Sequence, residues 1–298
     1  MAVFTTSPAP TLPGEGGGNA PERSGSSDSE MAIFARNRAH GRIDLSVVAR
    51  GGRTGRQRVV EEGSFRIRLP DVNGPESEAV IINTAGGVAG GDDFSIAIDA
   101  RPGAKLAVLT AAAEKVYRAI DAASRMNVRL SVSAGAALRW LPQETILFDG
   151  ARMHRSIEVD VAAGGSLVMA ESTIFGRSAM DEIMHRGEVI DRWRIRHDGR
   201  LVFADTLRLR DEISGLLGRR AAGGGASALA TVVFSPGDGT LAEKARECLA
   251  NCTSEAGVSA WNGMAVIRLC ATDAAHLRRD LVSVLNRLCG TLPRLWTN

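Results

Sequence analysis

The stretch Phe94–Leu109, FSIAIDARPGAKLAVL, shows the pattern that decides the fold. Phe94, Ile96 and Ile98 alternate with small or acidic residues, as in a strand that buries one of its faces. A Pro-Gly turn follows this run, and Leu106 lies in the next apolar run. The stretch therefore predicts two strands joined by a tight turn.

The same unit recurs three times further along the chain. Turn signals stand at residues 134–135, 164–165 and 198–199, and a leucine follows each turn by two or three residues. The leucines that follow the four turns are Leu106, Leu138, Leu167 and Leu201, which are 32, 29 and 34 residues apart. This spacing predicts a mainly β fold, an elongated stacked or helical array in which each unit covers the apolar face of its neighbour. An irregular β sandwich is the alternative that the pattern leaves open.

The two ends of the chain differ from this array. Residues 1–30 are rich in Gly, Ser and Pro, which predicts a disordered N-terminal extension and leaves open whether translation starts at Met1 or Met31. Residues 31–298 are expected to form a single domain with a β array over about 31–212 and a glycine-rich loop over about 215–225. A small α+β part is expected over about 226–298, with helices at Leu241–Leu249 and Ala274–Leu288.

Composition excludes several classes of protein. The formal net charge of +2 argues against a nucleic-acid binder that depends on bulk charge. No apolar run approaches the ~20 residues that span a bilayer, and the first residues lack the pattern of a signal peptide. We therefore expect a cytoplasmic protein with reduced cysteines. Cys248 and Cys252 are either small buried side chains or a metal or redox pair.

The glycine turn Thr84–Asp93 follows an apolar run and suggests a phosphate-binding loop at first sight. Such a loop needs Lys and Ser or Thr after its last glycine, but Asp92 and Asp93 stand there and would repel phosphate. We interpret the segment as a tight crossing between strands. Four glycines are expected to provide positive φ angles or close backbone approach: Gly86, Gly87, Gly90 and Gly91.

Several acids lie in apolar surroundings. Glu144 and Asp149 belong to the segment Trp140–Ala151, and they either cap turns at its rim or serve a function. An acid also follows each repeat leucine: Glu114, Glu144, Glu171 and Asp205. These acids either form a ladder along one face or an internal passage, or they mark one solvated turn in each unit.

Neither a tight zinc site nor a hydrolase triad has support in the sequence. The five histidines form no close ligand pair, and no Gly-x-Ser-x-Gly nucleophile motif is present. We therefore expect no catalytic residues and no tightly bound cofactor.

Five segments together resemble one family, the urease accessory protein UreD, also called UreH. They are Asn83–Asp92, Ala113–Arg118 (AEKVYR), Arg139–Ala151 (RWLPQETILFDGA), Phe175–Gly187 (FGRSAMDEIMHRG) and Leu292–Trp296 (LPRLW). The resemblance implies a non-catalytic β scaffold that joins the accessory protein UreF and the GTPase UreG on apo-urease. It also implies that nickel, supplied by other accessory proteins, reaches urease through an internal channel while UreG hydrolyses GTP.

Carboxylates suit such a channel, because imidazole and thiolate hold nickel tightly and would trap it in transit. The candidate residues for a transient nickel path are Asp92, Glu144, Asp149, Glu171 and Glu182. Two alternatives remain at this stage: a pure protein-binding scaffold with no metal path, and a β-rich enzyme that acts on carbohydrate with dispersed acids. The C-terminal helices and the loop at 215–225 are candidate docking elements for UreF.

Overall fold

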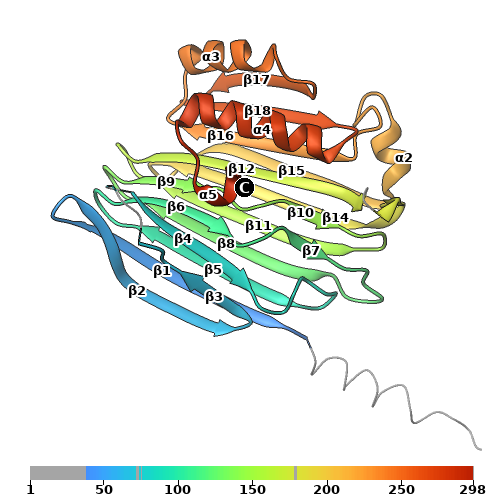
Figure 1. The fold of residues 1–298 in the computed structure, drawn as a ribbon, viewed down its shortest axis with the longest axis horizontal. Helices are drawn as coiled ribbons and strands as arrows, with labels where there is room; N and C mark the ends of the chain where they lie inside the picture. The colour runs from blue at the N-terminus through green and yellow to red at the C-terminus, as the bar shows by residue number, and fades with distance from the viewer. Residues whose placement is uncertain (1–37, 72–73, 75, 178–179, 298) are drawn as a thin grey trace, which may run out of the picture. The chain divides into compact units, whose positions relative to one another are not determined.

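The computed structural model describes residues 38–71, 74, 76–177 and 180–297. The extension expected over residues 1–30, and Met31, therefore lie outside the described residues. From Arg38 onward the chain builds two β-sheets that face each other, with helices on the outer side of one of them (Figure 1). The prediction of a mainly β fold with a few C-terminal helices is confirmed.

The first sheet has seven strands within the described residues. Its inner strands run parallel, and its two edge strands are antiparallel to their neighbours. In spatial order the strands are β15 (Arg200–Glu212), β14 (Arg186–His197), β11 (Arg152–Val161), β8 (Ser124–Val132), β5 (Asp93–Ala100), β1 (His40–Arg50) and β2 (Arg53–Gly63).

The second sheet has eleven strands in the part of the chain that the structure describes. Its main path is β17 (Glu255–Trp261), β18 (Met264–Ala271), β16 (Ala228–Ser235), β12 (Ser166–Arg177), β9 (Ala137–Trp140), β6 (Lys105–Thr110), β4 (Ser77–Asn83) and β3 (Phe65–Arg68). Three short strands complete it: β7 (Glu114–Val116), β10 (Thr145–Leu147) and β13 (Glu182–Ile183).

The chain winds between the two sheets like a solenoid. From β5 to β14 each unit places its first strand in the seven-stranded sheet and its next strand in the eleven-stranded sheet, so corresponding strands of successive units pair in parallel. The repeat leucines lie in register, because Leu106 pairs with Leu138 and Leu138 pairs with Leu167. The turn glycines also stack: the N–H of Gly135 donates to the carbonyl of Gly164 at 3.1 Å, and both have positive φ.

The fourth unit breaks the repeat, and the expected register of Leu201 is wrong. Asp198 and Gly199 both have positive φ and close a two-residue hairpin between β14 and β15. The chain therefore reverses within the seven-stranded sheet instead of crossing to the other one. Leu201 lies opposite Arg196 and is 47% exposed.

The C-terminal part extends the eleven-stranded sheet. The side chains of Asp238 and Asp273 cap the N-termini of α3 (Gly239–Leu249) and α4 (Ala274–Cys289). Both helices lie where the sequence predicts them, whereas β17 is an additional strand. The short helix α2 (Ile213–Gly218) takes the first residues of the segment that we expected to be loop, and α5 (Arg294–Thr297) ends the chain.

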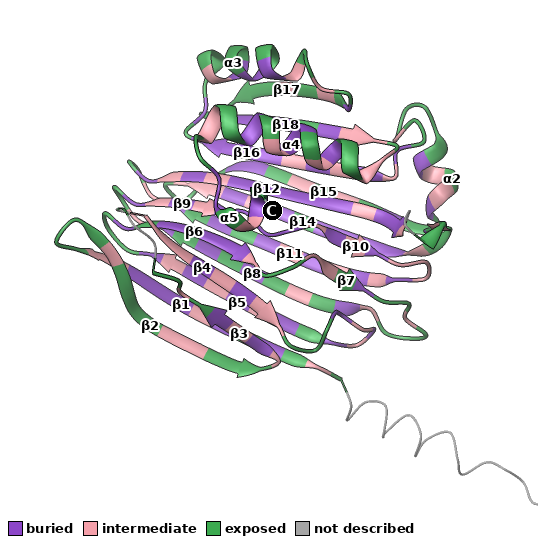
Figure 2. Ribbon diagram, viewed as in Figure 1, coloured by how far each residue is buried: buried purple, intermediate pink, exposed green. Residues whose placement is uncertain are grey.

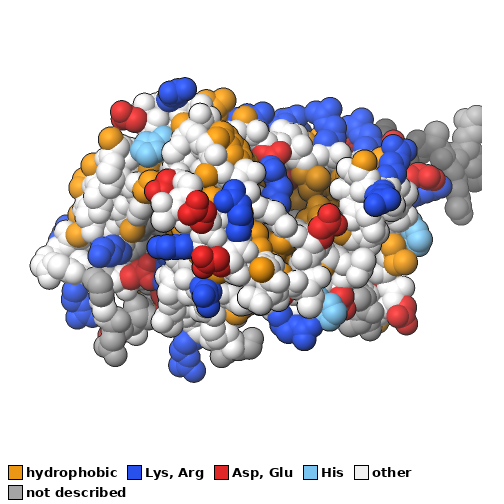
Figure 3. Space-filling view, turned by 90° about the horizontal axis from the view of Figure 1, so that it is seen from above, with side chains coloured by type: hydrophobic (Ala, Val, Ile, Leu, Met, Phe, Trp, Pro, Cys, Tyr) orange, Lys and Arg blue, Asp and Glu red, His pale blue; other side chains and the backbone are white. Residues whose placement is uncertain are grey.

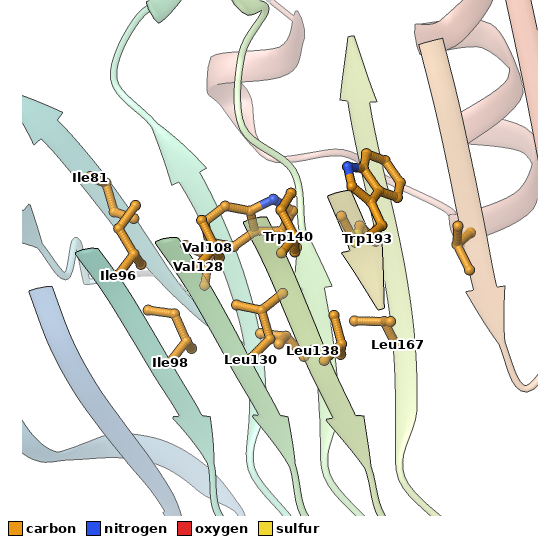
Figure 4. Packing of buried hydrophobic residues seen from close by; sticks show 14 of the residues in the cluster. Ile81, Ile96, Ile98, Val108, Val128, Leu130, Leu138, Trp140, Leu167 and Trp193 are labelled. Atoms are coloured by element: carbon orange, nitrogen blue, oxygen red, sulfur yellow. The ribbon is translucent and has the colours of Figure 1, made fainter. Parts of the chain in front are cut away.

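Two hydrophobic cores stabilise this arrangement. The larger lies between the sheets, where Ile96 and Leu130 face Val108 and Leu138 (Figure 4). The smaller lies between the outer face of the eleven-stranded sheet and the helices α3, α4 and α5. Buried residues accordingly line the middle of the strands, whereas β2 and the outward faces of α3 and α4 are exposed (Figure 2).

Surface charge is mixed on the side of α3 and β17, and basic side chains form a row along the upper rim of that view (Figure 3). Among the described helices, none has the length and apolar character that a bilayer crossing requires.

Candidate functional site

Three charged side chains lie between the two sheets, in the middle of the larger core. Arg155 on β11 donates through Nε and Nη2 to both carboxylate oxygens of Asp191 on β14, at 3.0 and 2.6 Å. Its Nη1 donates to Glu171 on β12 at 2.6 Å. The indole N–H groups of Trp140 and Trp193 donate to Glu171 and Asp191, at 2.7 and 3.0 Å. The trio carries a net charge of −1, and its hydrogen bonds hold it in an otherwise apolar space.

Burial and pairing act in opposite directions on these groups. Burial raises the pKa of Glu171, while Arg155 and the Trp140 N–H oppose that rise by favouring the carboxylate. Burial alone lowers the pKa of Arg155, but the charges of Asp191 and Glu171 outweigh burial and raise it. Arg155 therefore stays charged, and it holds the two carboxylates together.

An open cavity of about 530 Å³ reaches this trio from the edges of the two sheets. Its lining includes Arg155, Glu171 and Asp191 together with residues of β15, β16, β17 and β18. An ion pair between Arg268 Nη2 and Asp205 Oδ2, 2.5 Å apart, contributes to the same lining. Two carboxylates inside the molecule are thus connected to a cavity.

From Glu171 a line of polar side chains continues along the inner face of the eleven-stranded sheet. Thr173 lies two residues further on the same face of β12, about 6.6 Å along the strand. Thr145 on β10 pairs with Thr173 on one side and with Glu114 of β7 on the other. Parallel neighbours of this kind are about 4.8 Å apart.

Glu114 ends this line beside the glycine turn. Its Oε1 accepts a hydrogen bond from Asn83 Nδ2 at 3.1 Å. Burial raises the pKa of Glu114 to about 7; the Asn83 hydrogen bond opposes this rise and the charge of Asp92 adds to it. We call the set Arg155, Asp191, Glu171, Thr173, Thr145, Glu114 and Asn83 the inner polar row.

Asp92 is buried in the glycine turn and accepts two backbone hydrogen bonds. The N–H groups of Ala39 and Ala89 donate to its two carboxylate oxygens at 2.8 and 2.7 Å. The turn needs glycine where other segments approach it closely. A Cβ on Gly90 would lie 2.6 Å from the Cβ of Ala119, and Gly86, Gly87 and Gly91 have positive φ.

Glu144 lies near the helices rather than between the sheets. Its Oε1 is 3.0 Å from Nη1 of Arg278 on α4, and that guanidinium stacks on the ring of Trp296. The Trp296 indole donates to the carbonyl of Leu141 at 2.8 Å, and Gln143 donates to the carbonyl of Leu295 at 2.8 Å. Two motif segments that are far apart in the sequence, RWLPQE and LPRLW, thus form one structural unit.

Asp149 and Glu182 tie loops together at the ends of the strands. The backbone N–H groups of His185 and Arg186 donate to Asp149 Oδ1 at 2.8 and 2.9 Å. Burial would raise the pKa of Asp149, but these hydrogen bonds and Arg118 outweigh it and lower the pKa. Glu182 accepts from the N–H of Asp149 at 2.7 Å and pairs with Arg177.

Sequence comparisons identify relatives that match almost all of the chain from residue 39 onward. The profile of the family described as UreD urease accessory protein matches residues 39–297. A urease accessory protein UreD of Rhodopseudomonas palustris (strain BisA53) is 50% identical over 270 residues, which cover 91% of this chain and 94% of the relative. One from Bradyrhizobium diazoefficiens is 49% identical over 267 residues, covering 90% and 97% of the two chains.

The chain belongs to the UreD family. This confirms the resemblance that the motif segments indicated. Of the five candidate acids in this UreD family member, Glu171 lies in the inner polar row, and Asp92 lies beside its end at Glu114. Glu144, Asp149 and Glu182 lie outside the row, in contacts that join segments of the chain.

Sequence reasoning missed Arg155 and Asp191. Both were detectable, because each occupies the buried phase of an alternating strand: Arg155 stands between Met153 and Ile157, and Asp191 precedes Trp193 by two residues. A basic residue on one strand and an acidic residue on another, each at a position where the alternation predicts a buried apolar side chain, indicate a buried ion pair. Within the described residues, no group of three or more His, Cys, Asp or Glu side chains is placed to hold a metal ion.

Proposed function

We propose that this chain is a maturation factor for urease, a non-catalytic cytoplasmic scaffold that works with UreF, UreG and apo-urease. Family membership supports the role, since the relatives are urease accessory proteins by name. The single observation that supports a nickel path through the scaffold is the inner polar row, which crosses a core that is otherwise apolar.

The chemistry of the row suits an ion in transit. Nickel binds carboxylate and hydroxyl oxygen more weakly than imidazole or thiolate. Arg155 already forms ion pairs with both Glu171 and Asp191. A metal ion that enters the row must therefore compete with this guanidinium for the two carboxylates. The row would therefore attract a divalent ion through its net charge without holding it for long.

Glu114 would add a proton step to this passage. A carboxyl with a pKa of about 7 is partly protonated near neutral pH, and a metal ion binds the deprotonated form. Nickel that binds Glu114 in its protonated form would displace that proton to solvent.

A scaffold without a metal path is the second candidate, and one observation favours it. Glu144, Asp149 and Glu182 each bind another segment of the chain and lie outside the inner polar row, so their contacts position loops and helix α4. In that case the acids would matter only through assembly of the complex.

A reconstitution with purified components tests the proposed function. Apo-urease, UreF, UreG, GTP and nickel are combined with and without this chain, and nickel bound to urease is measured together with urease activity. We expect GTP-dependent nickel loading only when the chain is present. Equal loading without the chain would contradict the proposed role.

A further inference from the structure

The outer face of the seven-stranded sheet carries a concentration of positive charge that the inner row does not involve. The relevant positions are the outward-facing ones of β14 from Glu188 to Arg196 and the residues paired with them on β8, β11 and β15. They include eight arginines and three acids. The arginines, which we call the arginine face, are Arg125, Arg129, Arg152, Arg192, Arg194, Arg196, Arg208 and Arg210. Eight arginines and three acids give these positions a net charge of +5, which is larger than the net charge of +2 for the whole chain.

Some members of the arginine face are already engaged. Arg152 and Arg210 both bind Glu188, with N–O distances of 2.7 and 2.6 Å. Arg194 donates to the backbone carbonyls of Trp193 and Asp205. These three side chains help to hold the sheet together.

The other five arginines form no ion pair or side-chain hydrogen bond with described residues, and among them Arg192 and Arg208 are neighbours across β14 and β15. Both are exposed, and neither forms an ion pair or side-chain hydrogen bond with any residue that the structure describes. They are diagonal neighbours on the antiparallel pair β14–β15, since Arg208 lies opposite Ile190 and Arg192 opposite Thr206. Like charges at this diagonal spacing of about 7–8 Å repel each other, and an anionic group placed between them would offset that repulsion.

The pattern around these two arginines favours a protein partner over nucleic acid. Glu158 and Asp160 on the neighbouring strand β11 would repel a continuous phosphate backbone, whereas a protein surface can match both signs of charge. The outward positions of the arginine face also include no Phe, Tyr or Trp on which bases could stack.

We propose that the arginine face is a docking surface for a carboxylate-rich surface of another protein of the urease maturation complex, with Arg192 and Arg208 as its main contacts. The inference rests on the proposed function, because that function supplies the partner. The guanidinium groups would form charge-assisted, bidentate hydrogen bonds with the partner's carboxylates.

A simpler explanation is that charge on β14 and β15 only protects the edge of the sheet from pairing with another chain. Charge reversal separates the two explanations. Glutamate at positions 192 and 208 would protect the edge as well as arginine does, but it would repel an acidic partner.

The test compares Arg192→Glu/Arg208→Glu with the matched control Arg50→Glu/Arg56→Glu. Arg50 and Arg56 are exposed on β1 and β2, near the opposite edge of the same sheet, and the control changes the net charge by the same amount. Binding of each variant to purified UreF, UreG and apo-urease, singly and combined, is measured at low and high salt. A fluorescent DNA duplex serves as the nucleic-acid probe.

We expect the variant at positions 192 and 208 to lose about tenfold or more in affinity for one of these proteins, with salt-sensitive binding by wild type and no change in the control. Protein binding that matches wild type in both variants would overturn the inference, as would an effect confined to the DNA probe. Failure of the wild-type chain to bind any of the three proteins would instead contradict the proposed function itself.

Discussion

Acids of one chemical type occupy two different regions of this UreD family member. In the inner polar row, Glu171 is 4% exposed and shares a guanidinium with a second buried carboxylate. At the strand ends, the Asp149 side chain is 27% exposed and accepts backbone hydrogen bonds from a neighbouring loop. Both acids lie in segments that drew attention in the sequence, yet only the first faces the space between the sheets.

The face of the strand on which a carboxylate lies therefore decides whether it reaches the space between the sheets. Membership of a sequence motif does not decide this. Odd-numbered residues of β12 from Leu167 to Phe175 face the inner core, so Glu171 points inward. Glu144 precedes β10 and pairs with Arg278, a residue of α4 on the outer side of the same sheet. We therefore expect the two regions to respond differently to mutation.

The largest expected effect follows from the removal of Arg155. Arg155→Ala leaves Glu171 and Asp191 buried without their cation, which should lower the free energy of unfolding by about 3–5 kcal/mol. Urea denaturation followed by circular dichroism measures this change. A loss below about 1 kcal/mol would mean that solvent reaches the trio freely, contrary to its burial.

Glu114→Gln should have a smaller effect that depends on pH. In the folded chain the pKa of Glu114 is raised from 4.5 to about 7, so between these values the native state keeps a proton that the unfolded chain has lost. The stability of wild type therefore falls as pH rises through this window and stays low above it. Glu114→Gln has no titrating carboxyl at this position, so it does not lose stability in this pH range.

Relative to wild type, Glu114→Gln should gain nothing at about pH 4 and up to about 3 kcal/mol at about pH 8. Denaturation curves at several pH values, with Glu158→Gln as an exposed control on β11, provide the measurement. Parallel pH profiles for wild type and Glu114→Gln would contradict the burial of this carboxyl in the row.

The smallest effect is expected at Glu144. Glu144→Gln removes a partly exposed ion pair with Arg278 and should cost about 0.5–1 kcal/mol. Because Glu144 lies outside the inner polar row, nickel loading of urease in the reconstituted system should match wild type. A marked loss of nickel loading with an intact complex would show that Glu144 contributes to the nickel path. The two groups of acids would then not differ in function.

Much of the fold could be predicted because it is local and repeated. Alternation gave the strands, and the stacking of Leu106, Leu138 and Leu167 follows from a spacing that the sequence displays. The hairpin at Asp198-Gly199 was present as a turn signal, but its direction depends on two positive φ angles that spacing does not reveal. For that reason the spacing predicts the wrong register for Leu201.

The candidate site could be predicted only in part. Glu171 was found because it follows a repeat leucine, whereas Arg155 and Asp191 come from strands that pair across the sheet, at residues 36 positions apart. The partners of Glu144 and Asp149 are also distant in sequence, and only the folded chain brings them together.

The most direct test of the inner polar row as a nickel path removes its charge without leaving an unpaired ion. The triple variant Arg155→Met/Glu171→Gln/Asp191→Asn replaces the whole trio with neutral side chains of similar size, so no buried charge is left without its partner. Nickel bound to urease is measured after GTP-dependent loading with a complex whose assembly is verified by size-exclusion chromatography. We predict an assembled complex whose nickel content falls to the level seen without this chain; wild-type nickel content in that complex would contradict the path.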